Sequence, residues 1–181
     1  MKLLLTVSLL PILTAAGFAQ ASSSSGSDHC DLTAANLTRE GKLVRASGQV
    51  KAKSEAVDLS ADEATCNSDT GELELRGHVH AALPARADHS VFRYNSATFV
   101  TDKSVSIAAD RLVVKTGLLQ GWGHLVIRGL DPVSKEVELR GDEMYMFLRT
   151  ADATVSGNIK VSDSYKGPAT HRFVFPPDVV K

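Results

Sequence analysis

The residue types best suited to chemistry in this chain are two histidines, His78 and His80, separated by a single residue. If this stretch is a strand, side chains two positions apart lie on one face, so the pair could share a metal ion. The next residues, 81–84, are Ala-Ala-Leu-Pro and offer no carboxylate as a further ligand. His124 occupies the position of His78 in another copy of the strand pattern described below. We therefore interpret these imidazoles as outward, water-facing groups rather than metal ligands.

Cys30 and Cys66 are the only cysteines in the chain. In an oxidising compartment the two could form one intramolecular disulfide. Such a bridge would tie the start of the domain to the turn after the second strand group. A catalytic thiol would instead need a cluster of basic neighbours, which the sequence around Cys66 lacks.

Three aspartates recur in similar surroundings: Asp62 within Leu59–Ala64, Asp110 within Ile107–Leu112 and Asp142 within Leu139–Met144. Because they recur at one structural place, we expect them to form hydrogen bonds at a hairpin or bulge rather than act in acid–base chemistry. We find no catalytic set. We therefore expect no enzyme activity and no cofactor.

The three aspartates lie between copies of a strand pattern with a central glycine that occurs four times. In each copy the glycine has the parity of the apolar residues around it, so we expect all of them to point to one buried face. A glycine inside a strand indicates a bend, a bulge or the close approach of something inside the sheet. The copies are Val44-Ala46-Gly48-Val50, Leu73-Leu75-Gly77-Val79, Leu119-Gly121-Gly123-Leu125 and Val155-Gly157-Ile159-Val161.

Polar turns separate these strands, at residues 67–71, 115–117 and 150–152. Asn, Asp and Gly accept the left-handed backbone of a tight reversal, which predicts a series of hairpins. Residues 84–104 follow the pattern less closely, and no stretch after the first 21 residues shows helical periodicity. The sequence therefore predicts an all-β sandwich, barrel or jelly roll.

The start of the chain is typical of a secretory signal peptide. Met1-Lys2 precedes an apolar run from Leu3 to Leu13, and small residues end in Ala19-Gln20-Ala21. We expect cleavage after Ala21, with Ala19 as the alternative, and a soluble mature protein in the periplasm. The expected organisation is a signal peptide at 1–21, a flexible Ser/Gly leader at 22–30, one β domain at 31–165 and a proline-containing tail at 166–181.

The charge of the mature chain is nearly balanced, because loss of Lys2 leaves 19 basic against 21 acidic residues. A nucleic-acid partner would call for a basic surplus, so we expect none. Four basic residues lie near the first patterned strand: Lys42, Arg45, Lys51 and Lys53. They either form a solvated strand face that discourages edge pairing or contact an anionic headgroup.

Several of these segments resemble the repeats of OstA-like domains, the family that includes LptA, LptC and the periplasmic part of LptD. The resemblance covers roughly residues 43–162. It is carried by Ala61-Asp62-Glu63, Thr70-Gly71-Glu72-Leu73-Glu74-Leu75-Arg76-Gly77-His78-Val79, Ala109-Asp110-Arg111-Leu112-Val113-Val114 and Val155-Ser156-Gly157-Asn158-Ile159-Lys160-Val161.

The resemblance implies an open β-jelly roll whose apolar interior holds the acyl chains of lipopolysaccharide or another acylated glycolipid. An acyl chain gains roughly 0.8 kcal/mol per buried CH₂, so a carrier needs a long apolar trough. The expected trough residues are Val44, Val50, Leu73, Leu75, Val79, Ile107, Leu119, Leu125, Ile127, Met144, Met146, Leu148, Val155, Ile159 and Val161. The same residues could equally form an ordinary filled β core.

The resemblance also implies partners, which would be other OstA-like domains of LptC-like and LptD-like proteins, joined by strand pairing at exposed edges. A homo-oligomer through the same edges is a further expectation. We expect the edges near Leu43–Lys51 and Gly157–Ser162. The chain shows neither the barrel of LptD nor the uncleaved anchor of LptC, so we expect an LptA-like soluble carrier. The alternatives are a structural, polymerising β module without lipid and, last, a metal-dependent cupin-like enzyme.

Overall fold

The computed structural model describes residues 23–27, 30–54, 57–131 and 135–163, which are all-β. No helix within these ranges is long and apolar enough to cross a membrane. The strands are β1 (Ser23–Ser27), β2 (Cys30–Ala34), β3 (Asn36–Glu40), β4 (Leu43–Ser54), β5 (Val57–Asn67), β6 (Leu73–Leu83), β7 (Ser90–Tyr94), β8 (Ala97–Thr101), β9 (Val105–Lys115), β10 (Leu118–Leu130), β11 (Glu136–Phe147), β12 (Asp152–Ser156) and β13 (Lys160–Asp163).

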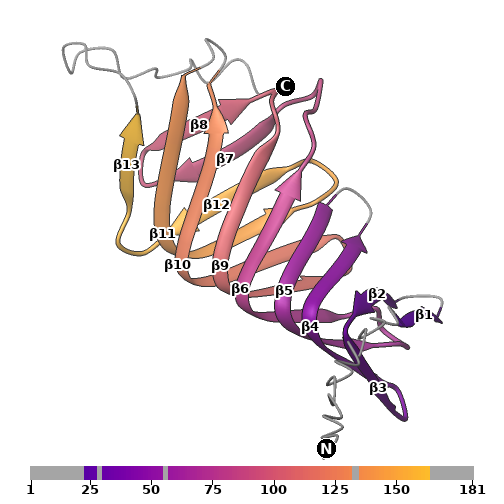
Figure 1. The fold of residues 1–181 in the computed structure, drawn as a ribbon. Helices are drawn as coiled ribbons and strands as arrows, with labels where there is room; N and C mark the ends of the chain where they lie inside the picture. The colour runs from indigo at the N-terminus through magenta and orange to yellow at the C-terminus, as the bar shows by residue number, and fades with distance from the viewer. Residues whose placement is uncertain (1–22, 28–29, 55–56, 132–134, 164–181) are drawn as a thin grey trace, which may run out of the picture.

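The strands form one open sheet in the order β1-β2-β4-β5-β6-β9-β10-β11-β12-β7-β8, with β3 beside β4 and β13 beside β11 (Figure 1). All pairs are antiparallel except β12 with β7. The expected turns are present: Thr116 and Gly117 have positive φ angles between β9 and β10, as does Ala151 before β12. The all-β prediction is confirmed.

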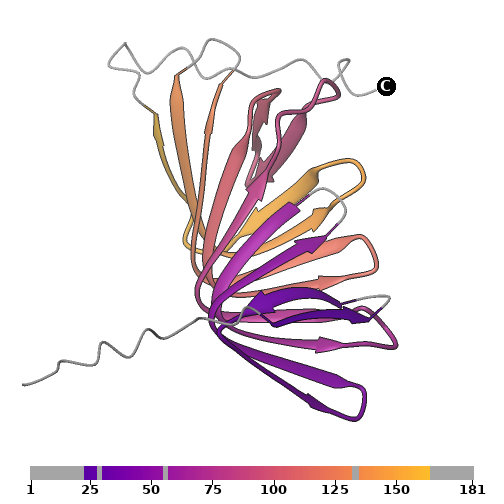
Figure 2. The same cartoon turned by 45° about the vertical axis from the view of Figure 1, so that its right-hand side comes forward.

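The long strands β4, β5, β6, β9, β10 and β11 bend near their middles, so each contributes to two layers. Register shifts mark the bends, for example between Ser47 and Val50 in β4 and between Trp122 and Leu125 in β10. The first half of β4 pairs with β3, whereas its second half pairs with β2. At the far end, β12 pairs with the second half of β11 and β13 with its first half. Figure 2 shows the two layers diverging from the line of bends.

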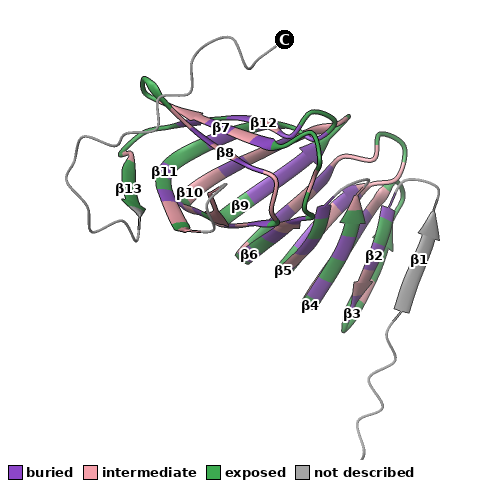
Figure 3. Cartoon of the chain, turned by 90° about the horizontal axis from the view of Figure 1, so that it is seen from above, coloured by how far each residue is buried: buried purple, intermediate pink, exposed green. Residues whose placement is uncertain are grey.

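We call the layer that runs from β3 to β12, β7 and β8 the first layer, and the layer that runs from β1 and β2 to β13 the second layer. Buried and exposed residues alternate along the long strands, as Figure 3 shows for β4, β5 and β6. The inward residues of both layers form one apolar cluster. This cluster is the core that holds the layers together.

Three of the bends share a repeated contact between a glycine and an aspartate. Gly77 and His78 both have positive φ angles, of 70° and 42°. A Cβ atom on Gly77 would lie 2.6 Å from the Oδ2 atom of Asp62. The same relation joins Gly123 to Asp110 and Gly157 to Asp142.

The glycines at the bends therefore do not point into the interior, contrary to our expectation. At Gly77, Gly123 and Gly157 the missing Cβ faces an exposed aspartate, because the left-handed backbone turns the residue away from the inward row. Gly121 does point inward, but its space is filled: a Cβ there would lie 2.9 Å from a methyl group of Leu112. The glycines leave no space for a ligand.

A disulfide joins Cys30 to Cys66, with 6.1 Å between their Cα atoms. Cys30 lies in β2 of the second layer, whereas Cys66 lies in the half of β5 that belongs to the first layer. The bridge therefore connects the two layers at the N-terminal end of the sheet.

The β7–β8 hairpin closes the other end. β7 pairs with β12 in the first layer, and Phe99 of β8 lies against Gly129 of β10 in the second layer. Phe92 and Phe99 stack with ring centroids 5.7 Å apart and are buried. The stretch 84–104, whose sequence pattern is loose, thus supplies a hairpin that contacts both layers.

Two expectations about the N-terminal region are wrong. Leu43–Lys51 is not an edge, because residues 30–40 form β2 and β3 and cover both halves of β4. Ser23–Ser27, expected as a flexible leader, forms β1 by pairing with the free edge of β2, since backbone pairing needs no particular side chains. The expected signal peptide and the tail at 166–181 lie outside the described residues.

The bend geometry predicts different costs for two glycine substitutions. Gly117 has a φ angle of 75° but nothing within 4 Å of an added Cβ, so Gly117→Ala adds backbone strain alone, about 1 kcal/mol. Gly77→Ala adds the same strain and a clash with Asp62, and we expect it to lower the free energy of unfolding by about 2–3 kcal/mol. Urea denaturation measures both; equal losses would contradict the proposed role of the Asp62 contact.

Loss of the disulfide should destabilise the fold. The bridge closes a loop with a sequence separation of 36, for which chain entropy gives about 3–4 kcal/mol. We expect the free energy of unfolding of the Cys30→Ser/Cys66→Ser double variant to be lower by this amount, so that the variant unfolds at a lower urea concentration. Adding a reductant should shift the wild-type midpoint and leave the variant unchanged. A wild-type midpoint insensitive to reductant would show that the bridge contributes nothing to stability.

Candidate functional site

The candidate site is the apolar interior between the two layers. Thirteen of the fifteen expected trough residues are buried members of its single cluster. Ile159 is partly buried and packs against the cluster. Val161 pairs with the buried Leu139 on the inner side of β13, yet it is 44% exposed. The buried residues are Val44, Val50, Leu73, Leu75, Val79, Ile107, Leu119, Leu125, Ile127, Met144, Met146, Leu148 and Val155.

The interior is filled by the protein's own side chains. Leu75, Ile107, Leu119 and Met146, which come from four different strands, have no exposed surface. An acyl chain could enter only if these side chains moved apart or the two layers separated. Val161 marks where the inner surface is already open to solvent, at the β13 edge.

Sequence reasoning missed several residues of this interior. Leu112 and Leu139 lie in the segments that contain the repeated aspartates; in β9 the bend changes the inward parity from Ile107 to Leu112, which simple alternation does not predict. Phe92 and Phe99 lie in the loosely patterned segment 84–104. The alternation of polar and apolar residues in Ser90–Tyr94 and Ala97–Thr101 could have indicated these two strands and their buried phenylalanines.

The four basic headgroup candidates do not form one patch. Lys42 pairs with Asp69 beside a turn, and Arg45 lies 3.5 Å from Glu40 in the first layer. Lys51 and Lys53 lie in the second half of β4 and face outward from the second layer. The bend in β4 separates the two pairs, so a single headgroup cannot contact all four from the interior.

The repeated aspartates form hydrogen bonds at the bends, as expected. Asp62 Oδ2 lies 2.7 Å from His78 Nδ1, and Asp110 Oδ2 lies 2.8 Å from His124 Nδ1. In the last copy, Asn158 Nδ2 donates to Asp142 Oδ2 at 2.7 Å. Each aspartate therefore holds the residue that follows the bend glycine.

Both histidines of the His78-Val79-His80 sequence are exposed. In the part of the chain that the structure describes, no group of three or more His, Cys, Asp or Glu side chains is placed to hold a metal ion. His78 instead serves the bend, and His80 lies on the outer face of the second layer.

The outer face of the first layer carries ion pairs and aromatic rings. Glu74 lies within 2.7 Å of both Arg76 and Arg111, and these two arginines lower the pKa of its carboxyl even though partial burial, the largest influence, acts to raise it. Arg111 lies over the ring of Trp122, 4.9 Å from its centroid, and Trp122 meets Tyr145 edge-on. These contacts stabilise the outside of the sheet and lie away from the interior.

The bend contact of His78 predicts a dependence of stability on pH. The hydrogen bond that His78 donates to Asp62, and then the negative charge of Asp62, raise the pKa of the fully exposed His78 imidazole. Because the pKa of His78 is higher in the folded than in the unfolded state, protonated His78 stabilises the fold. This stabilisation is complete at pH values below the unfolded-state pKa and is lost as the pH rises through the folded-state pKa. His78→Asn copies the Asn158 bend and cannot titrate, so we expect wild type to lose stability relative to this variant as pH rises. Urea denaturation at several pH values measures the difference, and parallel profiles would contradict it.

Neither the family models nor the curated proteins supply a relative from which a function could be transferred. No family model matches the chain, and no curated protein matches it. The function must therefore be inferred from the geometry of the interior, the edges and the surface.

Proposed function

We propose that this protein is a soluble periplasmic carrier that binds the acyl chains of lipopolysaccharide, or of a related glycolipid, between the two layers of an OstA-like open β-jelly roll. The carrying observation is that one continuous apolar cluster runs between the layers from Cys30 in β2 to Ile159 beside β13. A cluster of this extent suits a long apolar ligand better than a compact one.

For such a carrier to bind a lipid, contacts between core side chains must be replaced by contacts between these side chains and the acyl chain. An acyl chain gains roughly 0.8 kcal/mol per CH₂ removed from water, which offsets the cost of parting the layers only for a long chain. Met144 and Met146 lie in the interior, and their flexible side chains can adapt to an irregular apolar ligand. The exposed Val161 supplies a first contact at the β13 edge.

Edge strands support a bridge between domains. Among the described strands, β13 pairs only with β11, and β3 pairs only with β4, at the opposite end of the sheet. Their free backbone groups can pair with a strand of another OstA-like domain or of a second copy. The partners in this proposal are LptC-like and LptD-like proteins at the two ends.

The periplasmic location rests on the expected signal peptide at 1–21. The Cys30–Cys66 disulfide supports it, because such bridges persist in oxidising compartments and are rare in the cytosol.

A second candidate function is a structural β module that polymerises through the same edges and carries no lipid. The filled interior favours this alternative, because side chains such as Leu75 and Ile107 have no exposed surface. Both candidates share the fold and the edges. They differ in whether the layers open for a ligand.

The deciding experiment is native mass spectrometry of the protein purified from a lipopolysaccharide-producing host, followed by organic extraction of the bound material. We expect an acylated glycolipid. Val161→Asp should weaken its binding by about tenfold, because a charge at the open inner edge costs about 1–2 kcal/mol in contact with an acyl chain.

Ser162→Asp is the matched control, since Ser162 is also exposed on β13 but pairs with Glu138 on the outer face. It should retain the lipid. A lipid-free mass together with no uptake on titration would overturn the carrier proposal and leave the polymerising module.

A further inference from the structure

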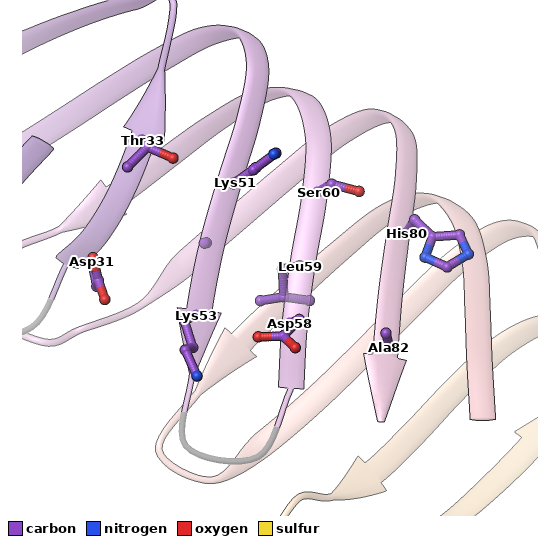
Figure 4. Close-up of a pocket in the computed structure, with 10 residues that line it drawn as sticks. Asp31, Thr33, Lys51, Lys53, Asp58, Leu59, Ser60, His80 and Ala82 are labelled. Atoms are coloured by element: carbon purple, nitrogen blue, oxygen red, sulfur yellow. The ribbon is translucent and has the colours of Figure 1, made fainter. Parts of the chain in front are cut away.

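A groove of about 430 Å³ lies on the outer face of the second layer, over β2, β4, β5 and β6 (Figure 4). Its polar residues alternate along the strands with buried residues, as Asp58 and Ser60 do on either side of Leu59. Ser60 and Ala82 have small side chains, which leaves the hollow between the longer ones. This volume is in the range of small-ligand sites, and the sheet itself separates the groove from the apolar interior.

One row of hydrogen-bond donors crosses the groove. Thr33 pairs with Lys51, Lys51 with Ser60, and Ser60 with His80, each on a neighbouring strand. Neighbouring strands are about 4.8 Å apart, so the row spans about 14 Å. Figure 4 shows Lys51, Ser60 and His80 on the same side of the sheet. Two hydroxyls, an ammonium group and an imidazole thus face one space.

The cations of the groove are not held in ion pairs by the described residues, although the carboxylates of Asp31 and Asp58 line the same groove. Neither Lys51 nor Lys53 forms a salt bridge with another residue in the described part of the chain, whereas Lys42 pairs with Asp69. The two lysines are two residues apart on one strand and face the same way, so their charges repel each other. Lys53 lies beside the carboxylate of Asp58, so an anion bound next to Lys51 on the other row would balance the remaining charge.

Carboxylates complete the other row of the groove. Lys53 lies opposite Asp58, which lies opposite Ala82, and Asp31 also lines the hollow. Carboxylates accept hydrogen bonds from hydroxyl groups but repel an anion. The groove therefore offers cationic and neutral donors along one row and acceptors beside them.

We propose that this groove binds a sugar phosphate. The phosphate lies on the donor row of Thr33, Lys51 and Ser60, and the sugar hydroxyls donate to Asp58 and Asp31. The chemistry is shared by a free sugar phosphate and by the phosphorylated headgroup of a glycolipid. The proposal is independent of acyl binding in the interior, since it concerns the opposite face of the sheet.

The test is titration of the whole mature protein with glucose 1-phosphate, followed by amide shifts in two-dimensional NMR. We expect shifts at Thr33, Lys51, Ser60 and His80, and weaker binding of glucose, which lacks the phosphate. Lys51→Gln/Lys53→Gln should weaken glucose 1-phosphate binding at least tenfold, since each charged hydrogen bond contributes substantially to affinity. Lys42→Gln is the control and should bind as wild type does.

Vesicles of phosphatidylcholine with and without monophosphoryl lipid A distinguish the two sources. Binding to the lipid A vesicles that depends on Lys51 and Lys53 would assign the groove to the headgroup; binding of glucose 1-phosphate alone would assign it to the free sugar phosphate. The proposal is overturned if glucose binds as well as glucose 1-phosphate, if the double variant binds as wild type does, or if neither phosphorylated probe binds. Glucose 1-phosphate has no acyl chain, so its binding or failure to bind does not test the apolar interior. The groove proposal and the carrier proposal can therefore be contradicted independently.

Discussion

Three of the bends that give this protein its two layers share a contact between a glycine and an aspartate on the neighbouring strand. An ordinary side chain cannot adopt the left-handed backbone at Gly77 without strain, and the space beside it is taken by Asp62. Asp62 in turn contacts His78, the second left-handed residue of the bend. Repeated on later strands, this contact aligns the bends along one line. The bends bring the two halves of long strands such as β6 into opposite layers, so that their apolar faces share one core.

Once the strands are bent, the two layers must be held at their ends, because twist tends to separate them there. The chain meets this requirement in two unlike ways. At the N-terminal end a covalent bond joins Cys30 to Cys66; at the other end the β7–β8 hairpin pairs with β12 and places Phe99 against the opposite layer. The β13 edge is not covered in the same way, as the exposure of Val161 shows. At this edge the inner surface contacts solvent through Val161.

Sequence patterns predicted what depends on local periodicity and failed where distant segments meet. Alternation identified the long strands and most of the interior, since burial follows parity on a pleated strand; it did not identify β1, β2, β3, β7 or β8. The recurrence of Asp62, Asp110 and Asp142 predicted bend hydrogen bonds, which the structure confirms. The prediction that the bend glycines point inward was wrong, because a residue with a left-handed backbone interrupts the inward–outward alternation of the strand. The covering of β4 by β2 and β3 was not foreseen, since pairing partners depend on contacts far apart in sequence.

The filled interior constrains how any acyl ligand could bind. Native packing is dense, so a ligand cannot simply be added to a core in which residues such as Leu119 and Ile127 are fully buried. The apolar contacts that it displaces must be replaced by contacts with the ligand, which makes opening costly for a short chain and favourable for a long one. If the layers opened for such a ligand, the bends would be the hinge line, because the strands run continuously from one layer to the other there. The disulfide and the β7–β8 hairpin would then restrict the opening to the β13 edge, where Val161 already contacts solvent.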